Sequence, residues 1–144
     1  MADFMSEFRT YLKTISAVTS LVGAAAAARI WFDLARQGAT LPYIVVAKGG
    51  GGQSYESLSD IAGLGQTILH VYCYGSTREQ AHSVSEAVRI AIQRYRGLMG
   101  STYVSEVHAI SGEESMVDPS QEKSDIHRWI AHRIYSIHHA EATS

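Results

Sequence analysis

Cysteine is nearly absent from this chain, since Cys73 is the only one among 144 residues. A single cysteine excludes an internal disulfide and a cysteine-based zinc knuckle, and this favours folding inside a cell. No apolar run approaches the roughly 20 residues that cross a bilayer. Asp3 and Glu7 interrupt the first residues, so we expect no signal peptide and no membrane partner.

Charge of either sign is also scarce. The 12 basic and 14 acidic residues give a formal net charge of −2, which offers no concentrated basic surface for gripping nucleic acid. The chain is 46% apolar and 18% charged, a composition typical of globular proteins. Its length predicts one domain spanning residues 1–144, with a single core.

Patterns that carry catalysis are missing as well. No serine lies in a Gly-x-Ser-x-Gly motif. The glycine run Gly49 to Gly52 is followed by Gln53-Ser54-Tyr55, where a phosphate-binding loop needs lysine and then serine or threonine. The acidic segment 112–125 lacks the alternating aspartates of a calcium loop. We therefore expect no catalytic residue and no cofactor, and we interpret residues 49–65 as a flexible arm.

Histidine is abundant and raises the hypothesis of a metal site. Seven histidines are present, and four lie near the C-terminus: His127, His132, His138 and His139. His132 and His138 share a strand face, but six residues at about 3.3 Å each place them roughly 20 Å apart. Only cross-strand partners such as His70 or His108 could complete a site. We expect no metal ligands and interpret the histidines as surface or interface residues, with a pH-responsive interface as an alternative.

The segment from Gln66 to Tyr74 predicts a strand with apolar side chains on both faces. One face carries Thr67, Leu69, Val71 and Cys73, and the other carries Ile68, His70, Tyr72 and Tyr74. Gly75 makes a turn, and Ser76 with Glu79 forms the pattern of a helix capping box. Apolar residues then repeat at helical spacing to Tyr95, and Gly97 is a suitable stop. A single helix covers only one of the two strand faces.

The rest of the chain predicts a small set of further elements. We expect helices at 3–15 and 18–21, and strands at 43–48, 102–110 and 126–137. An acidic loop follows at 112–125, and residues 138–144 are expected to be frayed. The order indicates an α+β fold in two layers: a mostly antiparallel sheet of about four strands with two main helices on one face.

Apolar side chains on the uncovered sheet face favour self-assembly, because an antiparallel sheet with a wet face normally alternates cleanly. Ile90, nearly opposite the apolar stripe of its helix, is a further candidate contact. The predicted interface residues are Ile68, His70, Tyr72, Tyr74, Ile90, Trp129, Tyr135, Gly49, Gly50, Gly51 and Gly52.

The succession of motifs resembles a known family. Leu21-Val22-Gly23 precedes Arg29-Ile30-Trp31, then Leu41-Pro42-Tyr43-Ile44-Val45-Val46, the strand Thr67 to Tyr74, the helix Thr77 to Tyr95 and a long last strand. Over about residues 8–137 this order resembles the tail completion and tail terminator proteins that join tail to head in long-tailed bacteriophages.

The resemblance implies a structural virion protein located at the head-tail interface and assembled in the host cytoplasm. It implies a homohexameric ring that caps the tail tube, with the tail tube protein and the head-tail connector protein as partners. DNA would pass through the ring without sequence-specific binding, and the subunit would not be an enzyme. The alternatives are a small metal-dependent enzyme that uses the C-terminal histidines, and a peptide-binding module that uses the arm at 49–65.

Overall fold

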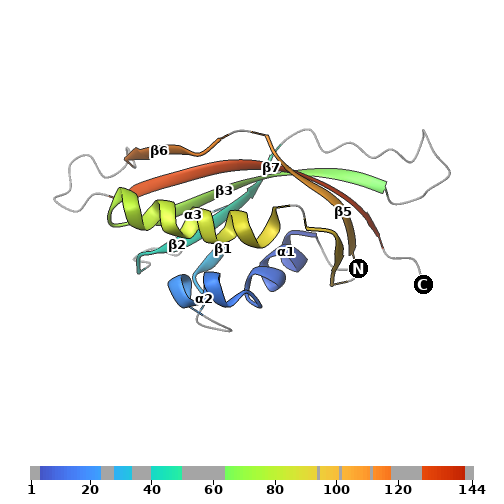
Figure 1. The fold of residues 1–144 in the computed structure, drawn as a ribbon, viewed down its shortest axis with the longest axis horizontal. Coiled ribbons are helices and arrows are strands. Elements are labelled where there is room, and N and C mark those ends of the chain that lie inside the picture. Colours follow the sequence, from blue (N-terminus) through green and yellow to red (C-terminus); the bar gives the residue numbers. More distant parts are fainter. Residues whose placement is uncertain are drawn as a thin grey trace.

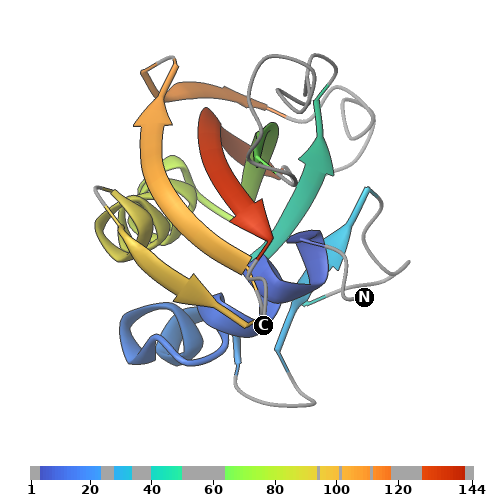
Figure 2. The same cartoon turned by 90° about the vertical axis from the view of Figure 1, so that its right-hand side faces the viewer.

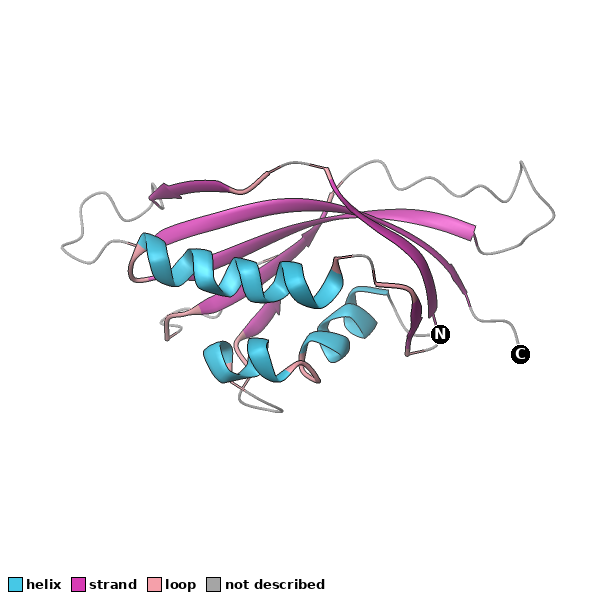
Figure 3. Ribbon diagram, viewed as in Figure 1, coloured by secondary structure: helices cyan, strands magenta, loops and turns pink. Residues whose placement is uncertain are grey.

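The computed structural model describes residues 4–23, 28–33, 40–49, 64–93, 95–100, 102–110, 112–117 and 128–141. Within these ranges the helices lie on one side of a curved sheet (Figures 1 and 3). The helices are α1 (Phe4–Leu12), α2 (Ser16–Val22) and α3 (Arg78–Ile92). The strands are β1 (Ile30–Phe32), β2 (Tyr43–Lys48), β3 (Leu64–Gly75), β4 (Gly97–Met99), β5 (Thr102–Ala109), β6 (Glu114–Val117) and β7 (Trp129–Glu141).

The strands form one seven-stranded sheet in the order β1-β2-β3-β7-β5-β4, with β6 also paired to β7. All pairs are antiparallel except β1 with β2. Both β5 and β6 lie along the same side of β7, and between them the Ile110 amide donates to the Ile134 carbonyl at 2.8 Å. Figure 2 shows the resulting curl, with β7 between β5 and β2. The predicted α+β class and mostly antiparallel sheet are confirmed.

The core lies between the sheet and the three helices. On β3, Leu69, Val71 and Cys73 are at most 2% exposed and belong to the same buried cluster as the apolar stripe of α3. This stripe contains Ala81, Val84, Val88 and Ile92. The predicted division of β3 into two faces, with α3 covering one of them, is therefore confirmed.

The two N-terminal helices extend the helical layer. Phe8 and Leu12 of α1 and Val18 and Val22 of α2 are completely buried. The Tyr11 hydroxyl donates to the Ala91 carbonyl at 2.9 Å and ties α1 to the end of α3. Both helices were expected at these places. None of the described helices has the length and apolar character that a membrane crossing requires.

The start and end of α3 differ from the prediction. Thr77 is the N-cap, and its Oγ1 accepts from the Gln80 amide at 3.1 Å, while Gln80 Oε1 accepts from the Ser76 amide at 2.7 Å. The capping pair thus lies one residue later than Ser76 and Glu79, because Thr77 is still extended. The helix ends at Ile92, and Gly97 begins β4 with a φ of 144° instead of stopping the helix.

The sheet has more strands than the four expected. β1, β4 and β6 have only three or four residues, too few to show alternation, and β6 lies in the predicted acidic loop at 112–125. β7 continues to Glu141 instead of ending at Ile137. Residues 138–141 are paired with β3 or β5, which corrects the expected fraying there. Two segments lie outside the described ranges: residues 50–63, which belong to the predicted arm, and residues 142–144 at the C-terminus.

Candidate assembly surface

The sheet face turned away from the helices is called the outer face here, and the residues of its central strands are known from the register. On β3 it carries Ile68, His70, Tyr72 and Tyr74, all half-buried. Directly paired residues share a face, so β7 adds Ile130, His132, Ile134 and Ser136, and β2 adds Tyr43, Val45 and Ala47. The outer face is therefore aromatic and aliphatic along three neighbouring strands.

Ring contacts connect these side chains across strands. The Trp31 and Tyr43 rings lie 5.5 Å apart, and the Tyr43 and Tyr74 rings stack at 4.6 Å. Further along the sheet, Tyr72 stacks on His132 at 4.3 Å. Cross-strand aromatic pairs of this kind contribute to the rigidity of a sheet surface. An aromatic band thus runs from β1 to β7 on the outer face, with Tyr43 buried within it and Trp31, Tyr72, Tyr74 and His132 half-buried.

A histidine pair lies in this band. His70 Nδ1 is 3.0 Å from His132 Nε2, and the two rings stack at 5.1 Å. Burial lowers the pKa of His132, the neighbouring His70 lowers it further, and Glu114 opposes both effects. Among the described residues no group of three or more histidines, cysteines or carboxylates could hold a metal ion. The pair is a contact between two imidazole rings within an aromatic surface.

The predicted contact residues do not all lie together. Trp129 and Tyr135 are paired with Gly75 and Leu69, which places both on the helix-covered face, and Tyr135 is only 1% exposed. Tyr135 is therefore a core residue, which corrects its assignment to a contact surface. The error arose because the two faces of the last strand were not assigned to the correct layers.

Ile90 and the glycine run lie apart from the band or at its edge. Ile90 is 70% exposed on α3, as its position opposite the apolar stripe predicts. Gly49 borders the outer face, since a Cβ atom on it would lie 2.8 Å from His70 Nε2. Gly50, Gly51 and Gly52 lie outside the described residues.

Several residues of the outer face were missed from the sequence. Trp31, Tyr43, Ile130 and Ile134 join the surface only through pairing, and the register between strands determines which of them meet. The available signal was the apolar character of both faces of residues 43–48 and 126–137, which indicated a second contact face but not its members.

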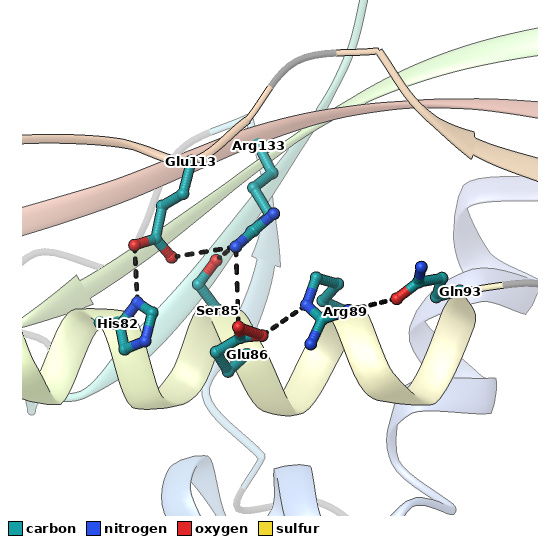
Figure 4. Close-up of polar contacts among 7 residues, drawn as sticks. All are labelled: His82, Ser85, Glu86, Arg89, Gln93, Glu113 and Arg133. Carbon is teal, nitrogen blue, oxygen red and sulfur yellow. Dashed lines mark hydrogen bonds and ion pairs between the residues drawn. The ribbon is translucent and has the colours of Figure 1, made fainter.

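A polar cluster holds the sheet to α3 on the other face (Figure 4). Arg133 of β7 donates from Nε to Ser85 Oγ at 3.2 Å, and its Nη2 lies 3.8 Å from Glu113 Oε1 and 3.9 Å from Glu86 Oε1. His82 Nδ1 lies 2.7 Å from Glu113 Oε2. The cluster therefore connects α3, β7 and the residue that precedes β6.

The ionisable groups of the helix-covered face have structural explanations. A hydrogen bond from Arg89 lowers the pKa of Glu86, as a helix pair three residues apart should. Burial raises the pKa of the Cys73 thiol, which is completely buried between strands. A thiol with a raised pKa is a poor nucleophile, and this agrees with the interpretation of Cys73 as a core residue.

Comparison with known proteins first defines the class, an α+β fold that a solved structure shares. A chain in the solved structure of the virion of a native gene transfer agent (GTA) particle matches with a TM-score of 0.59 and 13% identity, over 92% of each chain. This likeness concerns the fold. A family model described as tail completion protein gp17 matches residues 7–115, and the chain belongs to that family. No curated protein matches this chain.

Membership of this family makes the protein a structural component of the bacteriophage virion tail. The resemblance noted from the motifs and the location in the virion tail are confirmed, while a position at the head-tail interface stays a prediction.

Proposed function

We propose that the protein is a ring-forming tail terminator, which caps the finished tail tube and joins it to the head connector. The single observation that carries the proposal is the outer face, where half-buried side chains of β3 and β7, among them Ile68, Tyr72 and Ile134, lie side by side across the strands. Surfaces of this kind usually mark protein contacts. Family membership supports a role in completing the tail.

In this proposal the contacts are heterologous. A closed ring forms when each subunit presents one surface to a different surface of the next, and the rotation closes. The outer-face residues Ile68, His70, Tyr72 and Tyr74 form part of one contact, and Ile90 on α3 belongs to another. Gly49 borders the first contact. Six copies are proposed by the same analogy as the function.

The proposed subunit acts by binding and performs no covalent chemistry. Its partners are further copies of itself, the tail tube protein and the connector protein. DNA passes through the central hole without sequence reading, and the net charge of −2 suits a conduit because strong phosphate attraction would slow passage.

Mass photometry of the purified protein, alone and with assembled tail tubes, tests this function. A species of about six subunits, and its binding to tube ends in electron micrographs, are the expected results. A protein that remains monomeric at all concentrations and ignores the tubes contradicts the proposal. Binding along the sides of the tubes, and not at their ends, would instead indicate a different position in the tail.

A further inference from the structure

A groove of about 1020 Å³ lies between the C-terminal half of α3 and the edge of β5, and residues of both faces of β5 line it. Val107, Ala109 and Tyr135 belong to its strand side, while Arg89 and Gln93 come from α3. Arg133 and Gly112 line it as well, and Tyr95 with Arg96 precedes β4.

The groove runs along a strand edge that β4 leaves open. β4 pairs with β5 only at Thr102, Tyr103 and Val104. Among the described residues, the part of β5 from Glu106 to Ala109 has β7 on one side and no strand on the other. A strand that continued the line of β4 would fill this place and complete the sheet.

The backbone of this edge has donors that face the groove side. The Ile110 amide donates to Ile134 of β7 at 2.8 Å, so it points away from the open side. Because amide directions alternate along an antiparallel strand, the amides of Ala109 and Val107 point toward the open side. An unpaired row of this kind is a template for an added strand.

The charge of the lining indicates what such a strand would carry. Arg89, Arg96 and Arg133 line the groove. Arg89 is already paired with Glu86, and Arg133 lies 3.9 Å from Glu86 and 3.8 Å from Glu113. Arg96 is therefore the lining arginine that has no carboxylate partner among the described residues. The Glu106 carboxylate lies 2.8 Å from His108 Nε2, and both side chains belong to the outer face, as their pairing with His138 and Ser136 shows. Arg96 donates from Nε to the Ser105 carbonyl at 3.4 Å, which places its guanidinium at the β4 end of the open edge.

A buried hydroxyl in the groove also lacks a partner. Tyr135 is 1% exposed, and no described group hydrogen-bonds its hydroxyl. Burial is the largest cause of the raised pKa of this phenol, so the hydroxyl is a donor at neutral pH. A buried donor without an acceptor is unfavourable, and an incoming carbonyl or carboxylate oxygen would satisfy it.

We propose that this groove binds an extended, carboxylate-bearing segment of a partner protein, which adds to the free edge of β5 as a further strand. The segment hydrogen-bonds to the Ala109 and Val107 amides, and an acidic side chain of the segment faces Arg96 at the β4 end of the edge. About five residues span the open edge at 3.3 Å each. A polypeptide suits the groove better than a nucleic acid, because edge amides at strand spacing match a peptide backbone.

Fluorescence anisotropy with a labelled, acetylated peptide of about six alternating glutamates and valines tests the proposal. Wild-type protein is expected to bind it, and a peptide with lysine in place of glutamate is expected to bind at least about tenfold more weakly. Two variants address the two halves of the site. Ala109→Pro removes the outward amide without breaking a bond to β7, and Arg96→Glu reverses the charge at the β4 end.

Each variant is expected to weaken peptide binding about tenfold or more, while the matched control Ala109→Ser, which keeps the amide, stays within about twofold. Circular dichroism verifies folding, and if Ala109→Pro does not fold, Arg96→Glu alone decides. Failure of wild type to bind the acidic peptide overturns the proposal. So does equal binding of the lysine peptide.

Two other occupants are also distinguished. Binding of oligo-dT that Ala109→Pro abolishes would assign the groove to nucleic acid and overturn the proposal. A change in oligomer mass caused by Ala109→Pro would assign it to a second copy of this chain and overturn it too. The proposed ring is tested independently, since a monomer that binds the peptide rejects the ring alone, and a ring that ignores the peptide rejects this inference alone.

Discussion

At the scale of single residues, two histidines are held in surroundings that disfavour their charged form. His132 lies against His70 on the outer face, and burial is the main cause of its lowered pKa. His139 lies on the opposite face, where its ring stacks on Phe4 at 4.6 Å and its Nε2 is 2.6 Å from Thr67 Oγ1. Burial lowers the pKa of His139 as well, with Lys48 adding to the effect.

These shifts predict that the protein loses stability in mild acid. The unfolded imidazoles take up protons as the pH falls through about 6.5, whereas the folded ones do so only at lower pH. The unfolded state therefore binds more protons in this window, and the free energy of unfolding decreases as the pH falls from about 7.5 to about 5.5. Urea unfolding at several pH values measures the decrease.

The double variant His132→Asn with His139→Asn tests whether these two histidines cause the loss of stability in mild acid. It is expected to flatten the dependence of the urea midpoint on pH across this window, even if its stability at neutral pH is lower. The ion pair between Glu86 and Arg89 does not affect this comparison. The pKa of Glu86 is lowered from its usual value of 4.5, so Glu86 becomes protonated only at a pH below this window. An equal slope in wild type and variant would contradict the assignment to these two side chains.

At the scale of elements, the end of β3 and the first turns of α3 approach each other closely. A Cβ atom on Gly75 would lie 2.6 Å from the Ala81 amide nitrogen and 3.1 Å from the Ala81 Cα. Both are backbone atoms of α3, which cannot move aside as a flexible side chain can. Glycine at this position is therefore required by the close approach of the end of the strand to the first turns of the helix.

Gly75→Ala is expected to destabilise the protein by about 1–3 kcal/mol, because the helix must shift away from β3 and its buried stripe loses contacts. Gly112→Ala is the matched control: a Cβ atom there meets nothing within 4 Å, so the same substitution should change stability by less than about 0.5 kcal/mol. Urea unfolding of both variants measures the difference. Equal stability of the two would show that α3 adjusts without cost.

The same elements show how far the fold could be predicted. The two faces of β3 and the apolar stripe of α3 were predictable, because alternation over nine or more residues and a repeat at helical spacing are local signals. The short strands β1, β4 and β6 were not, since they form only by pairing with longer neighbours. The cap moved from Ser76 to Thr77 because a glutamine completes a capping pair as well as a glutamate does.

The candidate sites were predictable to different degrees. Tyr72 and Tyr74 were placed on the outer face correctly, because they alternate with the buried residues of their own strand. The layer of Tyr135 depends on the register between β7 and β3, which no local pattern of the last strand records. The groove beside β5 depends on the place where β4 ends. A strand of three residues is too short for its ends to be predicted from the sequence.

At the scale of the whole molecule, the aromatic band and the groove occupy different parts of one sheet. The aromatic band crosses β1, β2, β3 and β7, while the groove lies under the free edge of β5. A subunit with these two surfaces could contact its own copies through one and another tail protein through the other. Such a division would allow assembly and partner binding to be changed separately by substitution.

The outer face can be tested by placing a charge in it. Ile68→Asp and Ile134→Asp each put a carboxylate among half-buried residues of this surface, where a neighbouring subunit would have to desolvate it. Each variant is expected to remain folded by circular dichroism and to shift the mass in mass photometry from a ring to a monomer. Thr10→Asp, on an exposed position of α1, is the control and should leave the ring intact.

Rings of unchanged mass in both outer-face variants would show that the band is not a contact between subunits. Assembly would then have to use other surfaces, such as that around Ile90.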